Sequence, residues 1–143
     1  MMLDETIKKQ LIHLAFEART RAYAPYSGYC VGAAVLCGDD HTIFMGCNIE
    51  NASYGGTVCA ERTAAFKAVS EGHTHFEAIA IVGGKKDQPV SDYAFPCGIC
   101  RQVLREFANP DKMTVLVATG VNDYREFLLS ELLPESFGPS MLE

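Results

Sequence analysis

Three cysteines and one glutamate carry the chemistry that this sequence offers. Cys97 and Cys100 form a Cys-x-x-Cys motif, and Cys59 stands two residues before Glu61. Three thiolates can hold a zinc ion tetrahedrally and leave one coordination position open for water. The Cys-x-x-Cys motif by itself also fits a redox pair or half of a structural metal site. The third cysteine and the nearby acid favour a reactive site in which Glu61 overhangs the water.

Both cysteine segments stand where a helix is expected to begin, because apolar residues at steps of three and four follow each of them. The unpaired N–H groups and the positive dipole end of a helix N-terminus favour a thiolate. Cys97 and Cys100 are three residues apart, so their sulfurs can converge on one ion. In a first helical turn side chains tilt toward the N-terminal end, so Cys59 and Glu61 can lean over the same site.

Charge balance adds a candidate arginine to this set. Three thiolates and one zinc ion sum to −3 + 2 = −1, which leaves the metal electron-rich. Arg62 follows Glu61 in the same turn as Cys59, and a guanidinium there can donate hydrogen bonds to a ligand sulfur. Arg101, next to Cys100, is expected to be a solvated surface residue.

Helices and strands alternate along the chain. A helical face is predicted over 4–23, a second helix ends at Gly72, and a third precedes Asn109-Pro110. Strands are predicted at 29–36, 42–47, 76–82 and 113–118, and the first two read as a hairpin. The tail from Ser130 reads as a short helical turn before an aromatic-bearing terminus.

This order predicts an α/β fold of three layers, α/β/α, with a central mixed sheet covered by helices. Parallel pairing is expected where a helix connects two strands. The chain of 143 residues is close to one typical domain, and no repeat or linker interrupts it. A single domain over 1–143 is therefore expected.

Composition excludes several classes of protein. Hydrophobic residues make up 48% and charged residues 21%, which is typical of a folded globular chain, and the net charge is −6. Proteins that bind nucleic acids normally present a basic surface, so no nucleic-acid partner is expected. Charged residues begin at Asp4 and no apolar segment follows the N-terminus, so no signal peptide is expected. No stretch approaches the roughly 18 apolar residues of a membrane span, so none is expected. We expect a cytoplasmic protein with reduced thiols.

The remaining cysteines and the histidines are assigned no chemistry. Free cysteine is among the most buried residue types, and three cysteines lie in apolar, strand-like sequence: Cys30, Cys37 and Cys47. They are predicted to lie in the core. The four histidines, which fall outside the ligand pattern, are expected to be surface or packing residues: His13, His41, His73 and His75.

The motifs together resemble a known family. Cys59-Ala60-Glu61 and Pro96-Cys97-Gly98-Ile99-Cys100 resemble the split signature of zinc-dependent cytidine deaminases. The resemblance extends through 26–34, 46–54 and 59–64 and covers nearly the whole chain. These stretches are similar to the small, homotetrameric nucleoside branch of that family.

The resemblance implies hydrolytic deamination of cytidine and 2′-deoxycytidine to uridine and 2′-deoxyuridine, with release of ammonia, in pyrimidine salvage. It implies one zinc ion per subunit on Cys59, Cys97 and Cys100. Water adds at C4 of the base, and Glu61 passes protons to N3 and to the departing amine. A homotetramer whose subunits complete each other's pockets is implied as well.

The same resemblance implies a set of substrate contacts. Asn48 and Glu50 are implied to hold the ribose 3′-hydroxyl, and the Ala60 backbone to contact the base. Aromatic residues are implied to complete the pocket, the last of them from a neighbouring subunit: Tyr29, Tyr54 and Phe137. Cys30 stands where the family often has proline, which bears on substrate preference.

Three other functions stay open at this point. A deaminase with the same zinc core could act on another aminopyrimidine nucleoside, such as a nucleoside antibiotic, although Asn48 and Glu50 favour a ribose. Deamination within a polynucleotide conflicts with the net charge of −6. A non-catalytic structural zinc module or a redox protein leaves Glu61 unexplained, and no fourth ligand is evident for a closed zinc site.

Overall fold

A five-stranded mixed sheet forms the centre of the molecule, in a computed structural model that describes residues 3–38 and 40–143. The strand order is β2-β1-β3-β4-β5; β3 and β4 pair in parallel, and the other neighbours pair antiparallel. The strands are β1 (Tyr29–Cys37), β2 (Ile43–Cys47), β3 (Phe76–Lys85), β4 (Thr114–Gly120) and β5 (Asp123–Leu128). The chain passes through a helix between the two parallel strands, β3 and β4, as the sequence predicts.

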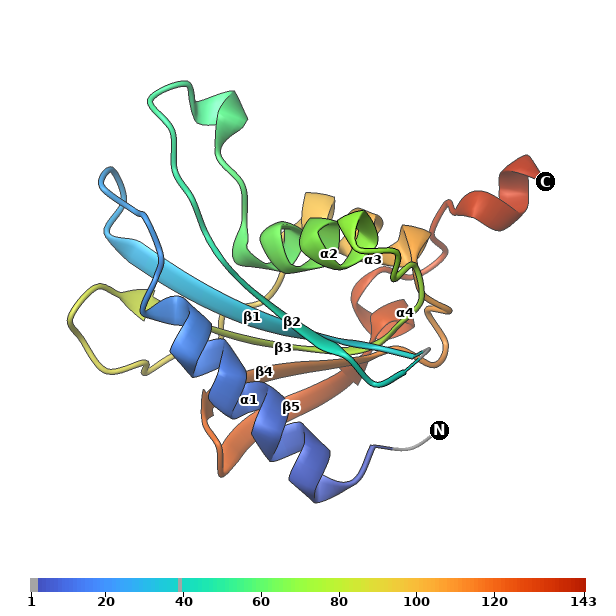
Figure 1. Cartoon of the computed structure of the whole chain (residues 1–143), viewed down its shortest axis with the longest axis horizontal. Helices are drawn as coiled ribbons and strands as arrows, with labels where there is room; N and C mark the ends of the chain where they lie inside the picture. The colour runs from blue at the N-terminus through green and yellow to red at the C-terminus, as the bar shows by residue number, and fades with distance from the viewer. Residues whose placement is uncertain (1–2, 39) are drawn as a thin grey trace.

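Helices cover both faces of this sheet. The longer helices are α1 (Glu5–Arg19), α2 (Ala60–Ser70) and α3 (Gly98–Glu106), and the short ones are α4 (Leu129–Leu132), η1 (Tyr54–Gly56) and η2 (Pro139–Leu142). Figure 1 shows α1 on one face and α2, α3 and α4 on the other. Each face has its own apolar core, so the predicted three-layer α/β fold is confirmed.

The first helix ends earlier than its periodicity predicts. Asp4 caps its start by accepting a hydrogen bond from the Ile7 backbone at 2.9 Å. Its last residue is Arg19 rather than Tyr23, because Tyr23 leaves the helix to exchange backbone hydrogen bonds with Asn48 and Glu50. Pairing with a distant segment thus overrides the local helical pattern.

The sequence analysis does not predict β5. Most of its residues are exposed, as expected for an edge strand, and its two half-buried residues, Tyr124 and Phe127, pack against the apolar cores on opposite faces of the sheet. Tyr124 packs on the α1 side, where its hydroxyl donates to Glu5 at 2.5 Å. Arg125 and Glu126 stand between Tyr124 and Phe127, so β5 lacks the apolar run from which β1 and β3 are predicted.

Two glycines let helices rest directly on the sheet. A side chain at Gly46 in β2 would place its first carbon 2.3 Å from the Ala64 backbone nitrogen in α2. One at Gly32 in β1 would lie 2.0 Å from the Ala15 carbonyl oxygen in α1. Both distances are far shorter than any real contact, so α1 and α2 pack against backbone at these points.

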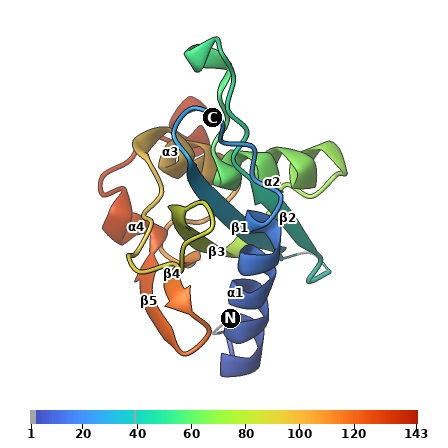
Figure 2. The same ribbon diagram turned by 90° about the vertical axis from the view of Figure 1, so that its left-hand side faces the viewer.

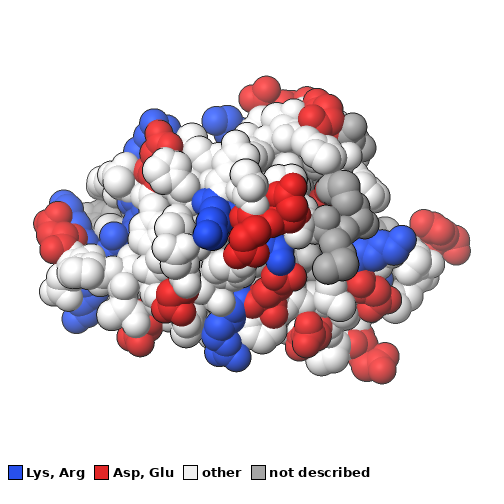
Figure 3. Space-filling model, turned by 90° about the horizontal axis from the view of Figure 1, so that it is seen from below, with Lys and Arg blue, Asp and Glu red and all other residues white. Residues whose placement is uncertain are grey.

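Two segments extend away from this body. Residues 48–58 leave the end of β2 as a long excursion with η1 at its tip, visible at the top of Figure 2. The chain after α4 leaves on the other side and ends in η2 (Figure 1). Basic and acidic side chains are interspersed on the face seen from below in Figure 3. None of the described helices is long and apolar enough to cross a membrane.

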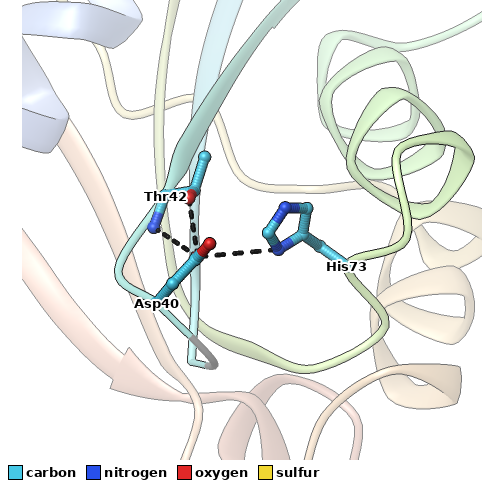
Figure 4. Close-up of polar contacts among 3 residues, drawn as sticks. All are labelled: Asp40, Thr42 and His73. Atoms are coloured by element: carbon cyan, nitrogen blue, oxygen red, sulfur yellow. Dashed lines mark hydrogen bonds and ion pairs between the residues drawn. The ribbon is translucent and has the colours of Figure 1, made fainter.

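The described cysteines and histidines that were assigned no chemistry lie outside the metal-ligating cluster. Cys30 and Cys37 are buried, as predicted, and Cys47 is half-buried. His73 lies 3.6 Å from the Asp40 carboxylate, which also accepts hydrogen bonds from Thr42 (Figure 4). The His73 ring also packs against the Phe44 ring, with the centroids 5.2 Å apart and the planes tilted by 55°. The structure therefore gives His73 a packing role between α2 and the β1–β2 turn.

Candidate functional site

Three cysteine sulfurs meet where two helices begin. Cys59 occupies the N-cap position of α2, Cys97 occupies that of α3, and Cys100 lies in the first turn of α3. The Sγ atoms of Cys59 and Cys97 are 3.8 Å apart, those of Cys97 and Cys100 are 3.5 Å apart, and all three lie within 4.8 Å of one another. The prediction that the three thiols converge is confirmed.

This cluster fits a zinc ion. Zinc–thiolate bonds of about 2.3 Å in a tetrahedron require sulfurs about 3.8 Å apart, and the observed separations are close to that value. The cluster contains three potential ligands and no fourth His, Cys, Asp or Glu among residues 3–38 and 40–143. A zinc ion held here therefore keeps one coordination position for a water or a substrate, as catalytic zinc sites do.

Glu61 is buried beside the sulfurs, with only 4% of its surface exposed. It lies in the first turn of α2, two residues after Cys59, so both side chains lie at the same helix end. Burial raises the pKa of Glu61 to about 7, and the nearby Cys59 thiolate adds to the rise. A buried carboxyl group in this position can take up and release a proton near neutral pH.

Arg62 contacts the cluster directly. Its Nη2 donates to the Cys59 Sγ at 3.4 Å, and its Nε is buried without a hydrogen-bond partner in the described structure. Hydrogen bonds with the Cys100 thiol and, to a smaller extent, with the Arg62 guanidinium lower the pKa of the Cys59 thiol to about 5. The hydrogen bond from Arg62 to a ligand sulfur, expected from the charge balance, is therefore present.

A cavity of about 450 Å³ opens beside Cys59, Cys97 and Glu61. It is large enough for a molecule of nucleoside size and is bounded by α2, by β1 and by the segment before α3. Besides those three residues it is lined by Ser27, Tyr29, Val31, Asn48, Glu50, Thr57, Val58, Ala60, Ile81, Tyr93, Ala94 and Phe95. The sequence-predicted residues Tyr29, Asn48, Glu50 and Ala60 thus share one cavity with Cys59, Cys97 and Glu61.

Asn48 and Glu50 are held in place by β1 and the preceding loop. The Asn48 side chain accepts from the Val31 backbone at 2.9 Å and donates to the Tyr29 carbonyl at 2.8 Å. The Glu50 carboxylate accepts from the Tyr26 and Ser27 backbones at 2.9 and 3.1 Å and from the Ser27 hydroxyl at 2.5 Å. Each group retains further hydrogen-bonding capacity for a ligand, and these bonds fix its orientation.

Two sequence-predicted residues lie outside this cavity. Tyr54, at the tip of the 48–58 excursion, is 75% exposed and lines a smaller hollow of about 380 Å³ that shares Ser27, Glu50 and Thr57 with the cavity. Phe137 is 58% exposed and lies in the segment that leaves on the other side of the molecule (Figure 1). One chain therefore does not bring these two aromatic residues to its own metal centre.

The structure also reveals cavity residues that the sequence analysis missed. Ser27 orients Glu50 through the hydrogen bond from its hydroxyl. The one sequence signal for this role is that Ser27 precedes Gly28 in a short turn, where Gly28 adopts a φ of 68°. Tyr93, Ala94 and Phe95 form a cavity wall although the sequence suggests only a loop there. Their proximity to Pro96 and Cys97 could have suggested this.

Comparisons with known proteins agree with the geometry. Residues 5–117 match the family model described as the cytidine and deoxycytidylate deaminase zinc-binding region. A cytidine deaminase of Sporosarcina psychrophila is 48% identical over 129 residues, covering 90% of this chain and 90% of that protein. A cytidine deaminase of Halalkalibacterium halodurans is 48% identical over 130 residues, covering 91% and 93%.

Solved structures give the same relation. The crystal structure of cytidine deaminase from Burkholderia pseudomallei superimposes with a TM-score of 0.75 at 45% identity, covering 90% of this chain and 97% of that one. The cytidine deaminase of Mycobacterium tuberculosis superimposes with a TM-score of 0.74 at 38% identity, covering 96% and 99%. The matches span nearly the full length of both partners.

Proposed function

This chain belongs to the cytidine and deoxycytidylate deaminase family, and on that premise we propose that it hydrolyses cytidine and 2′-deoxycytidine to uridine and 2′-deoxyuridine with release of ammonia. The observation that carries the proposal is the convergence of three thiols and the buried Glu61 at one end of a nucleoside-sized cavity. A purely structural zinc site or a redox pair would leave the buried Glu61 carboxyl group without a function.

Cys59, Cys97 and Cys100 would hold the zinc ion. When bound, zinc supplies Lewis acidity that lowers the pKa of water toward neutrality. Glu61 removes a proton from the attacking water, delivers it to N3 of the pyrimidine, and protonates the amine that leaves from C4. One carboxyl group within reach of water and ring thus performs every proton transfer.

The rest of the cavity orients the nucleoside. Asn48 and Glu50 bind the ribose 3′-hydroxyl with the donor and acceptor positions that their backbone contacts leave unused. Tyr29 packs against the nucleoside, and the Ala60 backbone at the start of α2 contacts the base. Since Asn48 and Glu50 suit a ribose, we favour cytidine over other aminopyrimidine nucleosides.

The proposed substrate is a free nucleoside rather than a polynucleotide. No lysine or arginine belongs to the described cavity lining, and the net charge of the chain is −6. Phosphate groups require cationic partners that these residues do not supply. We place the enzyme in pyrimidine salvage and in the cytoplasm, where its six cysteines are expected to stay in the thiol form.

We further propose a homotetramer in which neighbouring subunits complete each cavity. Tyr54 and Phe137 are exposed on opposite extensions of the chain, where they can reach other subunits but not their own metal centre. Sedimentation equilibrium tests this arrangement, and a fully active monomer would exclude it.

The proposed activity is tested by incubating purified protein with cytidine and following the loss of cytosine absorbance, with zinc measured on the same sample. Conversion to uridine with about one zinc ion per chain supports the reaction and the cofactor together. Zinc without conversion of any aminopyrimidine nucleoside would instead indicate a structural site.

Replacing Arg62 with glutamine is expected to lower kcat by about 10-fold while zinc remains bound, because partners of metal ligands typically contribute 10- to 100-fold. The guanidinium withdraws electron density from the Cys59 sulfur through its 3.4 Å hydrogen bond. Steady-state kinetics and zinc content check this expectation, with the exposed Lys67→Gln on the same helix as the control. Wild-type kcat at full zinc occupancy would contradict it.

A further inference from the structure

The cavity has a wall that belongs to no helix or strand. Residues 91–95, here called the wall segment, lie between β3 and α3 and directly precede Pro96 and the metal-binding Cys97. Tyr93, Ala94 and Phe95 line the cavity on this side. The position of these three residues therefore determines the shape of the space that receives a substrate.

Backbone hydrogen bonds do not hold the wall segment. Within the described parts of the chain, no backbone-to-backbone hydrogen bond involves any residue from 91 to 95. A segment without such bonds opens locally at low cost unless side chains fix it. The contacts of its side chains therefore decide how well the wall is ordered.

The edge strand β5 supplies a polar anchor for this wall. The Tyr93 hydroxyl donates to Asp123 Oδ1 at 2.7 Å. The other oxygen of the Asp123 carboxylate accepts a hydrogen bond from Thr119 at the end of β4. Tyr93 is thereby tied to the β4–β5 turn.

Arg125 on the same strand supplies a second anchor. Its guanidinium carbon lies 5.7 Å from the ring centre of Tyr93, 5.5 Å from that of Phe95 and 5.0 Å from that of Phe127. All three distances fall within cation–π range. The Phe95 and Phe127 rings also meet edge to face at 5.6 Å. One arginine thus bridges two residues of the wall segment to β5.

The sheet limits movement of the wall in the opposite direction. Ala94 lies against Gly83 of β3 so closely that a side-chain carbon built on Gly83 would be 2.8 Å from the Ala94 methyl group. The wall segment is therefore held between the Gly83 backbone and the side chains of Asp123 and Arg125. Loss of one anchor is expected to let Tyr93 and Phe95 shift in the cavity wall.

We propose that Arg125 is a positioning residue that sets nucleoside affinity by holding Tyr93 and Phe95 in the cavity wall, an inference that rests on the proposed deaminase function. Arg125 is not among the cavity-lining residues, so it acts through the two aromatic rings. Because Arg125 acts through Tyr93 and Phe95 and not on Glu61 or the three sulfurs, we expect its contribution to fall on binding and not on the chemical step.

The test compares the steady-state kinetics of Arg125→Ala with those of the wild type. We expect KM for cytidine to rise about five-fold at unchanged kcat and zinc content, the size expected for exposed cation–π contacts. Arg125→Lys keeps the cation but not the planar guanidinium, so its KM is expected to lie between the two. The matched control is Glu126→Ala, the next residue of β5, which faces Lys8 of α1 on the opposite side of the sheet.

Amide hydrogen exchange provides a readout that does not depend on turnover. Exchange over residues 91–95 is expected to accelerate in Arg125→Ala and to stay at the wild-type rate in Glu126→Ala. A wild-type KM in Arg125→Ala, or a fall in kcat or zinc content in place of a KM rise, would overturn the proposal. An inactive wild-type protein would refute the deaminase function instead, so the two failures are distinguishable.

Discussion

The Glu61→Gln protein is expected to fold and to bind zinc but to deaminate cytidine at least about 100-fold more slowly than the wild type, since general acid–base catalysis typically contributes 100- to 10,000-fold. Glutamine has nearly the same shape and can still hydrogen bond. It cannot take a proton from water or deliver one to the ring. Single-turnover kinetics and zinc content on the same sample measure the effect.

Glu50→Gln is the matched control, because the described cavity lining contains two carboxylates and Glu50 is the other one. Glu50 is bound to the Tyr26 and Ser27 backbones and to the Ser27 hydroxyl, so its replacement is expected to raise KM more than it lowers kcat. If Glu61→Gln kept its turnover within a few-fold at full zinc occupancy, Glu61 could not be the proton shuttle.

Loss of the metal is expected to have an effect of similar or greater size. Cys100→Ala removes the fully buried ligand of the cluster, and we expect zinc content to fall and activity to drop by more than about 1,000-fold, because Lewis-acid stabilisation amounts to several kcal/mol. Dialysis of the wild type against a chelator is expected to give the same loss, reversed by added zinc. Metal analysis alongside the activity assay checks both.

Cys47→Ala provides the control for this experiment. Cys47 is a half-buried thiol outside the cluster, where it contacts the Arg21 carbonyl at 3.4 Å. Its replacement is expected to leave zinc and activity unchanged. If chelated protein kept its activity while Cys97 and Cys100 formed a reversible disulfide, the redox interpretation would replace the zinc site.

Most of the metal cluster could be predicted from the sequence because local rules place its three cysteines, although the approach of Cys59 to Cys97 is a long-range contact. Spacing within one helical turn brings Cys97 to Cys100, and helix N-termini place both of them and Cys59 at the same kind of position. Periodicity likewise indicated the main helices and the strands of the sheet interior. The position of Glu61 in the first turn of α2 followed from the same local argument, whereas its burial was not predicted.

Features that depend on distant pairing could not be predicted in this way. The early end of α1 results from hydrogen bonds between Tyr23 and residues of the 48–58 excursion. Arg101, expected to be solvated, donates to the Pro96 carbonyl at 2.8 Å and to the Leu132 carbonyl at 2.6 Å. The path of the tail determines that second contact, and no local pattern encodes it. The wall segment is a further case, since its partners lie in an edge strand with a mixed pattern.

The absence of a side chain at Gly46 has a consequence for how this enzyme can vary. The Ala64 backbone touches β2 there, so any larger residue must push α2 outward, together with Cys59 and Glu61 at its first turn. We therefore expect a substitution at Gly46 to alter metal affinity and proton transfer, although Gly46 itself takes part in neither. In an engineered library, tolerance to substitution is expected to be lower at Gly46 than at Tyr29, which borders the cavity from an exposed strand end.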